Sequence, residues 1–189
     1  MEMFNVLFLN RKGGVGKTTI VDELVYSLRR KGKIVEFRTM DQQGGSAHEE
    51  SEVEEGQFRI IDTPGGDGAL LEALQLADQV DLVVIPVLPT TAELEPTLLT
   101  FKLLNGVAPD VDRVVVINQY DPRGVLDKQV YAALEGEDFE IIGTIPRAKA
   151  ISRAKGAGKS VAEYQPKNPS VAAFDNLADY IIKKSEERS

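Results

Sequence analysis

The chain has 189 residues, 42% hydrophobic and 28% charged, which is enough apolar material for one sizeable core, so we predict a single domain over residues 1–189. It contains no cysteine, which excludes structural disulfides, thiolate nucleophiles and cysteine-ligated zinc or iron–sulfur clusters. The formal net charge is −8, and a surface of that charge repels nucleic acid and anionic membranes on average.

The N-terminal stretch lacks the basic region and the long apolar run of a signal peptide. No apolar run approaches the ~20 residues that a membrane-spanning helix needs. We therefore expect a soluble, cytoplasmic protein.

Short apolar runs alternate with stretches of helical periodicity along the whole chain. The predicted strands are residues 3–9, 33–38, 58–62, 81–87, 112–118 and 139–145. The predicted helices are residues 18–31, 68–77, 91–104, 124–134, 148–154 and a last helix that begins at Asn168 and Pro169. Residues 42–57, which are rich in glycine and then in acid, are predicted to form a mobile loop.

This alternation predicts an α/β fold: a three-layer sandwich with a mainly parallel sheet and helices on both faces. The near-continuous apolar runs at residues 82–85 and 114–117 favour strands that are covered on both faces. In the order of the predicted strands, we expect the sheet order 2-3-1-4-5-6.

Residues 12–19 carry the clearest chemical signal. They read Lys-Gly-Gly-Val-Gly-Lys-Thr-Thr between a predicted strand and a predicted helix, which is the context of a phosphate-binding loop. Glycines let backbone N–H groups surround phosphates, and the helix N-terminus adds a positive end. We expect Lys17 to bridge the β- and γ-phosphates of ATP and the Thr18 hydroxyl to bind Mg²⁺. The expected nucleotide-binding residues of the loop are Gly13, Gly14, Val15, Gly16, Lys17, Thr18 and Thr19.

The loop departs from the standard spacing at its start. Where the standard loop has its first glycine, this chain has Arg11, and Lys12 follows it. A lysine at this position projects away from its own nucleotide and could reach the nucleotide of a neighbouring subunit. The alternative is a lysine that only meets solvent.

Two aspartates end predicted strands at the edge of the sheet where the loop lies. Asp62 follows an apolar strand, where a carboxylate can hold a water molecule of Mg²⁺. Asp41 ends another strand and could orient the attacking water, so it joins Lys12 and Lys17 as a candidate catalytic residue. For both aspartates the alternative is a turn residue.

Three residues at strand ends are candidates for the adenine base. Asn118 ends an apolar strand with an amide that could read the edge of the base, and Pro146 and Arg147 could pack against it. The alternative is that all three are turn residues.

The loop resembles the deviant Walker A motif of the ParA/MinD family of ATPases. The likeness continues in chain order over nearly the whole sequence, and it favours short ParA-type partition ATPases. Residues 40–44, Met-Asp-Gln-Gln-Gly, resemble the family's Asp-Pro-Gln-Gly with Gln42 in place of proline, and residues 60–64 resemble its Walker B strand. The other similar segments are residues 84–87, 145–147, 158–161 and 164–166.

The resemblance implies an ATPase that forms a homodimer on binding ATP, with Lys12 reaching the phosphates of the other subunit. It further implies that this dimer binds DNA without sequence preference, associates with the nucleoid, and partitions or positions DNA or another cargo. A ParB-like or other small adaptor protein would stimulate hydrolysis. Between Asp41 and Asp62, family members usually have a longer insert.

A run of bases without acids offers phosphate contacts for such DNA binding. The alternative is an ordinary solvated segment. The candidate DNA-binding residues are Arg147, Lys149, Arg153, Lys155 and Lys159.

Two other functions remain open on the same fold. A MinD-like, membrane-associated positioning ATPase needs a C-terminal amphipathic segment with bulky apolar anchors, and residues 181–189 offer few. An ATP-dependent metabolic enzyme, such as a dethiobiotin-synthetase-like ligase, would not explain Lys12. We expect no catalytic or metal-binding role for His48.

Overall fold

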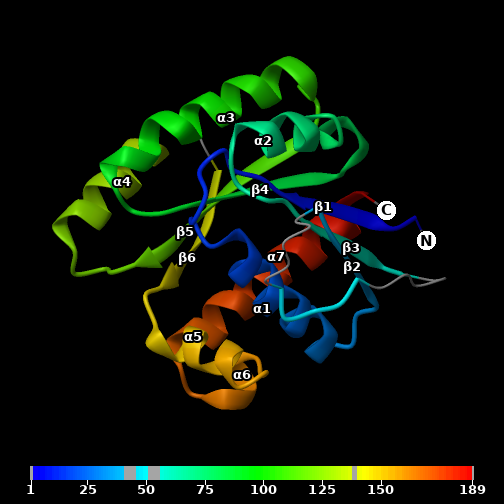
Figure 1. Cartoon of the computed structure of the whole chain (residues 1–189), viewed down its shortest axis with the longest axis vertical. Helices are drawn as coiled ribbons and strands as arrows, with labels where there is room; N and C mark the ends of the chain where they lie inside the picture. The colour runs from blue at the N-terminus through cyan, green and yellow to red at the C-terminus, as the bar shows by residue number, and fades with distance from the viewer. Residues whose placement is uncertain (1, 41–45, 51–55, 138–139, 189) are drawn as a thin grey trace.

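The computed structural model describes residues 2–40, 46–50, 56–137 and 140–188 (Figure 1). Within these residues, six parallel strands form one sheet in the order β2-β3-β1-β4-β5-β6, which confirms the predicted order. The strands are β1 (Phe4–Phe8), β2 (Val35–Thr39), β3 (Phe58–Asp62), β4 (Leu82–Val87), β5 (Asp112–Tyr120) and β6 (Glu140–Pro146).

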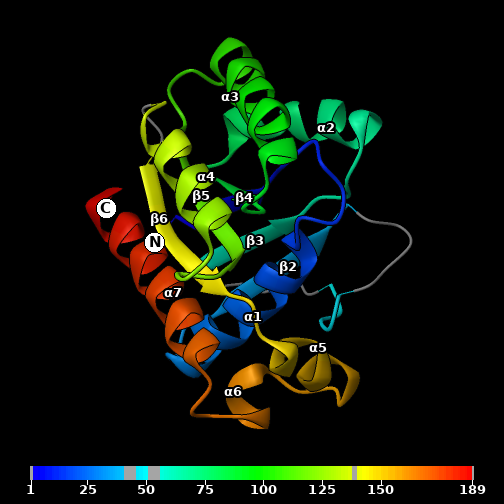
Figure 2. The same ribbon diagram turned by 90° about the vertical axis from the view of Figure 1, so that its left-hand side faces the viewer.

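Helices cover both faces of the sheet, as Figure 2 shows, so the predicted three-layer α/β sandwich is also confirmed. One layer contains α1 (Lys17–Arg30) and α7 (Pro169–Arg188), and the other contains α2 (Asp67–Leu74), α3 (Leu94–Val107) and α4 (Val125–Glu135). Two short helices, α5 (Lys149–Gly156) and α6 (Val161–Tyr164), continue the α1 side beyond β6. Two 3-10 turns, η1 (Ala77–Gln79) and η2 (Thr91–Glu93), precede β4 and α3.

The alternation of side chains along each strand divides the core into two parts. Phe8, Phe37 and Ile60 point into a cluster with α1 and α7, whereas Leu7, Val83 and Ile85 point into a cluster with α2, α3 and α4. All six residues of β4, in the middle of the sheet, are buried. This double burial is why the central strands read as continuous apolar runs in the sequence.

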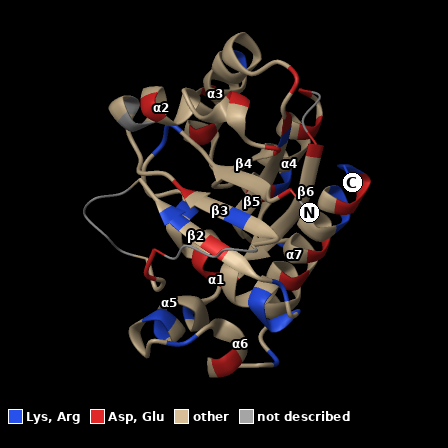
Figure 3. Ribbon diagram, turned by 90° about the vertical axis from the view of Figure 1, so that its right-hand side faces the viewer, with Lys and Arg blue, Asp and Glu red and all other residues tan. Residues whose placement is uncertain are grey.

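Near the β2 edge, the face turned away from α1 carries charged side chains (Figure 3). The buried Glu36 carboxylate accepts hydrogen bonds from Arg38 Nε and Arg59 Nε, each at 2.8 Å. Burial would raise the pKa of Glu36, but the hydrogen bonds and charges of the two arginines outweigh it and lower that pKa. The charges belong to β2 and β3, which residues 40–57 join in the sequence.

Most element boundaries agree with the sequence to within a few residues. One element, α6, was missed, although residues 160–163 carry its signal. Ser160 Oγ accepts a hydrogen bond from the Glu163 N–H, and the Glu163 side chain accepts one from the Ser160 N–H, which is a capping box. The predicted mobile loop 42–57 falls largely on residues 42–45 and 51–55, which lie outside the described residues.

Among the residues that the structure describes, no helix has both the length and the apolar character to cross a bilayer.

Candidate nucleotide-binding site

The connection between β1 and α1 is built on glycines with left-handed backbone conformations. Gly14 has φ 80° and Gly16 has φ 94°, a region in which a side chain is strained. Gly16 is the N-cap of α1, and its carbonyl accepts the first helical hydrogen bond, from the Ile20 N–H at 2.9 Å. The glycines therefore let the chain turn sharply and present the N-terminus of α1 at the carboxyl edge of the sheet.

Asn118, near the end of β5, supports this loop. Its side chain is buried, and Nδ2 donates to the Val15 carbonyl at 2.9 Å. A Cβ atom on Gly16 would lie 2.2 Å from that Nδ2 atom. The structure thus uses the Asn118 amide to hold the loop backbone, while contact with adenine stays a prediction.

Lys17 begins α1 and folds back over the loop. The side chain is buried, and its Nζ atom donates to the carbonyls of Asn10 at 3.2 Å and Lys12 at 3.4 Å. Asn10 is itself fixed, because its Nδ2 donates to the Pro86 carbonyl at 2.7 Å and its Oδ1 accepts from the Lys12 N–H at 2.9 Å. The ammonium group is therefore held by two backbone carbonyls of the chain after β1, and β4 fixes one of these residues, Asn10.

The chain after β3 packs directly on the loop. Asp62 is buried at the end of β3, next to Phe8 at the end of β1. Thr63 Oγ1 donates to the Phe8 carbonyl at 2.7 Å. A Cβ atom on Gly65 would lie 2.6 Å from the Gly13 Cα atom, so backbone meets backbone here. A shift of the loop would therefore displace residues 63–66 as well.

The remaining predicted phosphate and metal residues lie at this edge as well. Thr18 and Thr19 are half-buried in the first turn of α1, and Gly13 is exposed beside them. Asp41 lies outside the described residues. The Met40 N–H donates to the Asp62 carbonyl at 2.9 Å, so the chain reaches the Asp62 edge immediately before Asp41.

Lys12 is exposed, and it lies near an acidic residue, Glu93, that no sequence motif indicated. Glu93, the last residue of η2, is buried, and its Oε2 atom has no hydrogen-bond partner among the described residues. Burial raises the pKa of Glu93, and the positive charge of Lys12 partly opposes the shift. In the sequence, Glu93 looks like an ordinary acid at the start of a helix, because its burial depends on the tertiary structure.

Pro146 and Arg147 follow β6 at the same edge. Pro146 pairs with Tyr120 of β5, and the Arg147 N–H donates to the Tyr120 carbonyl at 3.4 Å. β6 is the third strand from β1 in the sheet order. Packing of these residues on adenine stays a prediction.

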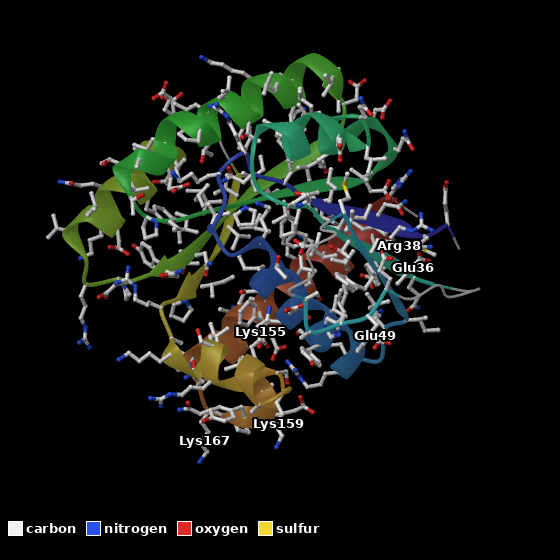
Figure 4. All side chains as sticks on the ribbon, in the orientation of Figure 1. Glu36, Arg38, Glu49, Lys155, Lys159 and Lys167 are labelled. Carbon is white, nitrogen blue, oxygen red and sulfur yellow. The ribbon has the colours of Figure 1, made fainter. Side chains whose placement is uncertain are left out.

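The five predicted DNA-binding residues are all exposed, but they are not equivalent. Lys155 Nζ lies 3.0 Å from an oxygen of the buried Asp22 carboxylate in α1. Figure 4 shows Lys155 where α5 meets α1, whereas Lys159 and Lys167 lie at the outer end of this region. The sequence could not separate these lysines, because the difference depends on a contact between residues 133 positions apart.

The parallel sheet and the glycine-rich turn into α1 define the fold of P-loop nucleotide-binding proteins. Residues 6–161 match the family model described as the CobQ/CobB/MinD/ParA nucleotide binding domain, and the chain belongs to this family. The resemblance of the sequence to ParA/MinD proteins is thereby confirmed.

Individual relatives cover 80% or more of the chain. The chromosome-partitioning ATPase Soj of Thermus thermophilus is 26% identical, with 96% of each chain covered. The maintenance of carboxysome distribution protein A of Halothiobacillus neapolitanus is 26% identical, covering 80% of this chain and 83% of the relative. Septum site-determining protein MinD of Pyrococcus horikoshii, solved with Mg-ADP, superposes with a TM-score of 0.77 at 17% identity, covering 100% and 99% of the two chains.

Proposed function

We propose that this protein is a Mg²⁺-dependent ATPase whose ATP-bound homodimer positions DNA or another cargo. The observation that carries the proposal is the phosphate loop, in which the Lys17 ammonium is held inside a glycine-built turn at the N-terminus of α1. Membership of the nucleotide-binding family and the similarity to Soj, a chromosome-partitioning ATPase, support it.

The residues present suit ATP and Mg²⁺. The loop N–H groups, the positive end of α1 and Lys17 together would hold the phosphates. Thr18 offers a hydroxyl and Asp62 a buried carboxylate at the end of a neighbouring strand, which are the oxygen ligands that Mg²⁺ or its waters prefer. Bound there, Mg²⁺ would neutralise phosphate charge. Asp41, one residue beyond the Met40–Asp62 hydrogen bond, would orient the attacking water.

Lys12 has a different proposed task. It stands at the start of the loop with an exposed side chain, whereas Lys17 is buried in the same loop. We assign Lys12 to the nucleotide of the second subunit, where it reduces the repulsion between two facing triphosphates. A small adaptor protein would then stimulate hydrolysis and dissolve the dimer.

The proposed DNA-binding surface lies on and beside α5. Each phosphate contact lowers log K by roughly 0.9 per unit of log salt, so four contacts per dimer give a slope of about −3.6. A monomer offers half the contacts, so binding should require ATP and should be indifferent to base sequence.

The test is fluorescence anisotropy of a random duplex with ATP, with ADP and without nucleotide, across a salt series. The double variant Arg153→Glu with Lys159→Glu should lose DNA binding, since it reverses two exposed charges on this surface. Lys102→Glu with Lys128→Glu makes the same change in charge on α3 and α4 and should bind as wild type does. If the ATP-bound dimer ignores DNA at low salt, the cargo is not DNA and only the ATPase proposal stands.

A further inference from the structure

The buried carboxylate of Asp22 joins two segments that are far apart in the sequence. Its Oδ1 atom accepts hydrogen bonds from Ser46 Oγ at 2.5 Å and from the Ala47 N–H at 3.0 Å. Its Oδ2 atom accepts one from Lys155 Nζ at 3.0 Å. The side chain is only 5% exposed, so this carboxylate depends on these partners in place of water.

The first of these segments is anchored to α1 by more than Asp22. His48 Nε2 lies 3.0 Å from the Asp22 carbonyl, and the ring packs on Tyr26 with centroids 4.4 Å apart. Desolvation lowers the pKa of His48, which favours the neutral ring in this contact. In the same segment, Glu50 accepts a hydrogen bond from the Thr39 N–H at 3.0 Å, so the segment contacts the carboxyl end of β2.

The second segment is α5, which carries the proposed DNA-binding residues. The Lys155 side chain is 38% exposed, so its ammonium lies at the boundary between α1 and solvent (Figure 4). An ammonium that is paired with Asp22 cannot at the same time neutralise a DNA phosphate. The flexible lysine stem, however, allows the group to exchange one partner for the other.

We propose that the Asp22–Lys155 ion pair withholds Lys155 from DNA and couples the DNA-binding surface to the segment that follows β2. The inference rests on the proposed DNA-binding function. A change at the nucleotide edge that moves residues 46–47 alters two of the contacts that stabilise the Asp22 carboxylate. Once its ion pair with Asp22 is broken, the Lys155 ammonium can contact a phosphate, so the number of DNA contacts per subunit changes along with dimerisation.

The direct test removes the charge that holds Lys155. Asp22→Asn keeps an oxygen for Ser46 and Ala47 but no longer forms the ion pair. Without nucleotide, we expect this variant to bind a random duplex about tenfold more tightly than wild type near 50 mM salt, with a salt slope steeper by roughly 0.9 per subunit. Anisotropy titrations across a salt series measure both quantities.

Two matched variants separate this effect from a general change in charge or a structural role. Glu49→Gln removes one negative charge from the same exposed segment and should leave affinity within about twofold of wild type. In a Lys155→Met background, Asp22→Asn should add nothing. A gain that is equal with and without Lys155, or a folded Asp22→Asn protein that binds no more tightly than wild type, would overturn the proposal.

The single variant Lys155→Met gives an independent measurement that does not depend on how Asp22→Asn folds. We expect it to leave DNA binding without nucleotide unchanged and to reduce the salt slope of the ATP-bound state by roughly 0.9 per subunit. An unchanged slope with ATP would contradict the proposal while leaving the DNA-binding function intact. If wild type with ATP binds no DNA at all, the proposed function and this inference both fail.

Discussion

The phosphate loop and the α5–α6 region are both held against their surroundings at helix α1, but by different forces. The loop is fixed by uncharged contacts at close range, such as the Asn118 amide on the Val15 carbonyl and the approach of Gly65 to Gly13. The α5–α6 region packs its apolar side chains on the same core and is also held by two buried carboxylates of α1, Asp22 and Glu23. Steric contacts allow one geometry, whereas a carboxylate can exchange one donor for another. We infer that the proposed phosphate site is rigid, whereas the proposed DNA-binding surface can adjust.

The largest effect on stability is expected at Gly16, where the loop leaves no space for a side chain. Gly16→Ala must adopt φ near 94° and push the Asn118 amide away from Val15, which costs about 2–5 kcal/mol in the free energy of unfolding. Thermal unfolding without nucleotide measures this cost as a lower Tm. Gly13→Ala is the matched control, because a Cβ there meets nothing within 4 Å. Equal stabilities of the two variants would show that the loop is not rigid.

A smaller loss is expected at the contact between β1 and the chain after β3. Thr63→Val keeps the shape of the side chain but removes its buried hydrogen bond to the Phe8 carbonyl, which should cost about 1–2 kcal/mol. Denaturant unfolding gives the value. Thr90→Val, at a half-buried position, is the control and should change stability by less than about 0.5 kcal/mol. If Thr63→Val loses no more stability than Thr90→Val, the hydrogen bond from Thr63 to Phe8 does not stabilise the site.

A third effect, a pH dependence, is expected at α6. Burial raises the pKa of Glu23 to about 7, although the Val161 N–H opposes the shift by donating to its carboxylate at 2.9 Å. The pKa of Glu23 is thus higher in the folded state than in the unfolded state. The protonated side chain therefore contributes stability that is fully present below pH 4.5 and is lost as pH rises through 7. Glu23→Gln should therefore make the free energy of unfolding fall less steeply between these pH values, as urea titrations can show. An unchanged slope would contradict this assignment.

The sequence predicted the fold because its signals are local. The periodicity of the apolar runs gave the strands and helices, and residues 12–19 gave the loop between β1 and α1. The helix α6 was not predicted, because its four residues are too few to show a helical periodicity. Only the spacing of Ser160 and Glu163 indicates it in the sequence.

What the sequence did not predict depends on contacts between distant residues. Asn118 was considered for the base because it ends a strand, and its support of the loop requires the neighbouring backbone of Val15. Asp22 reads as a polar position on an amphipathic helix, yet it is buried under Ser46 and Lys155. Lys155 likewise looked equivalent to Lys159, since charge patterns along a chain do not show which ammonium meets a carboxylate.

The central claim is that two lysines of one loop serve the nucleotides of two different subunits. ATP affinity and molar mass by light scattering, measured on Lys12→Ala and Lys17→Ala, test it most directly. We expect Lys17→Ala to lose at least about 100-fold in ATP affinity, because in the proposed site the buried ammonium would be the main positive charge on the phosphates. Lys12→Ala should bind ATP within about threefold of wild type and remain a monomer at saturating ATP. A severe loss of ATP affinity in the Lys12→Ala monomer, or a normal ATP-dependent dimer, would contradict the account.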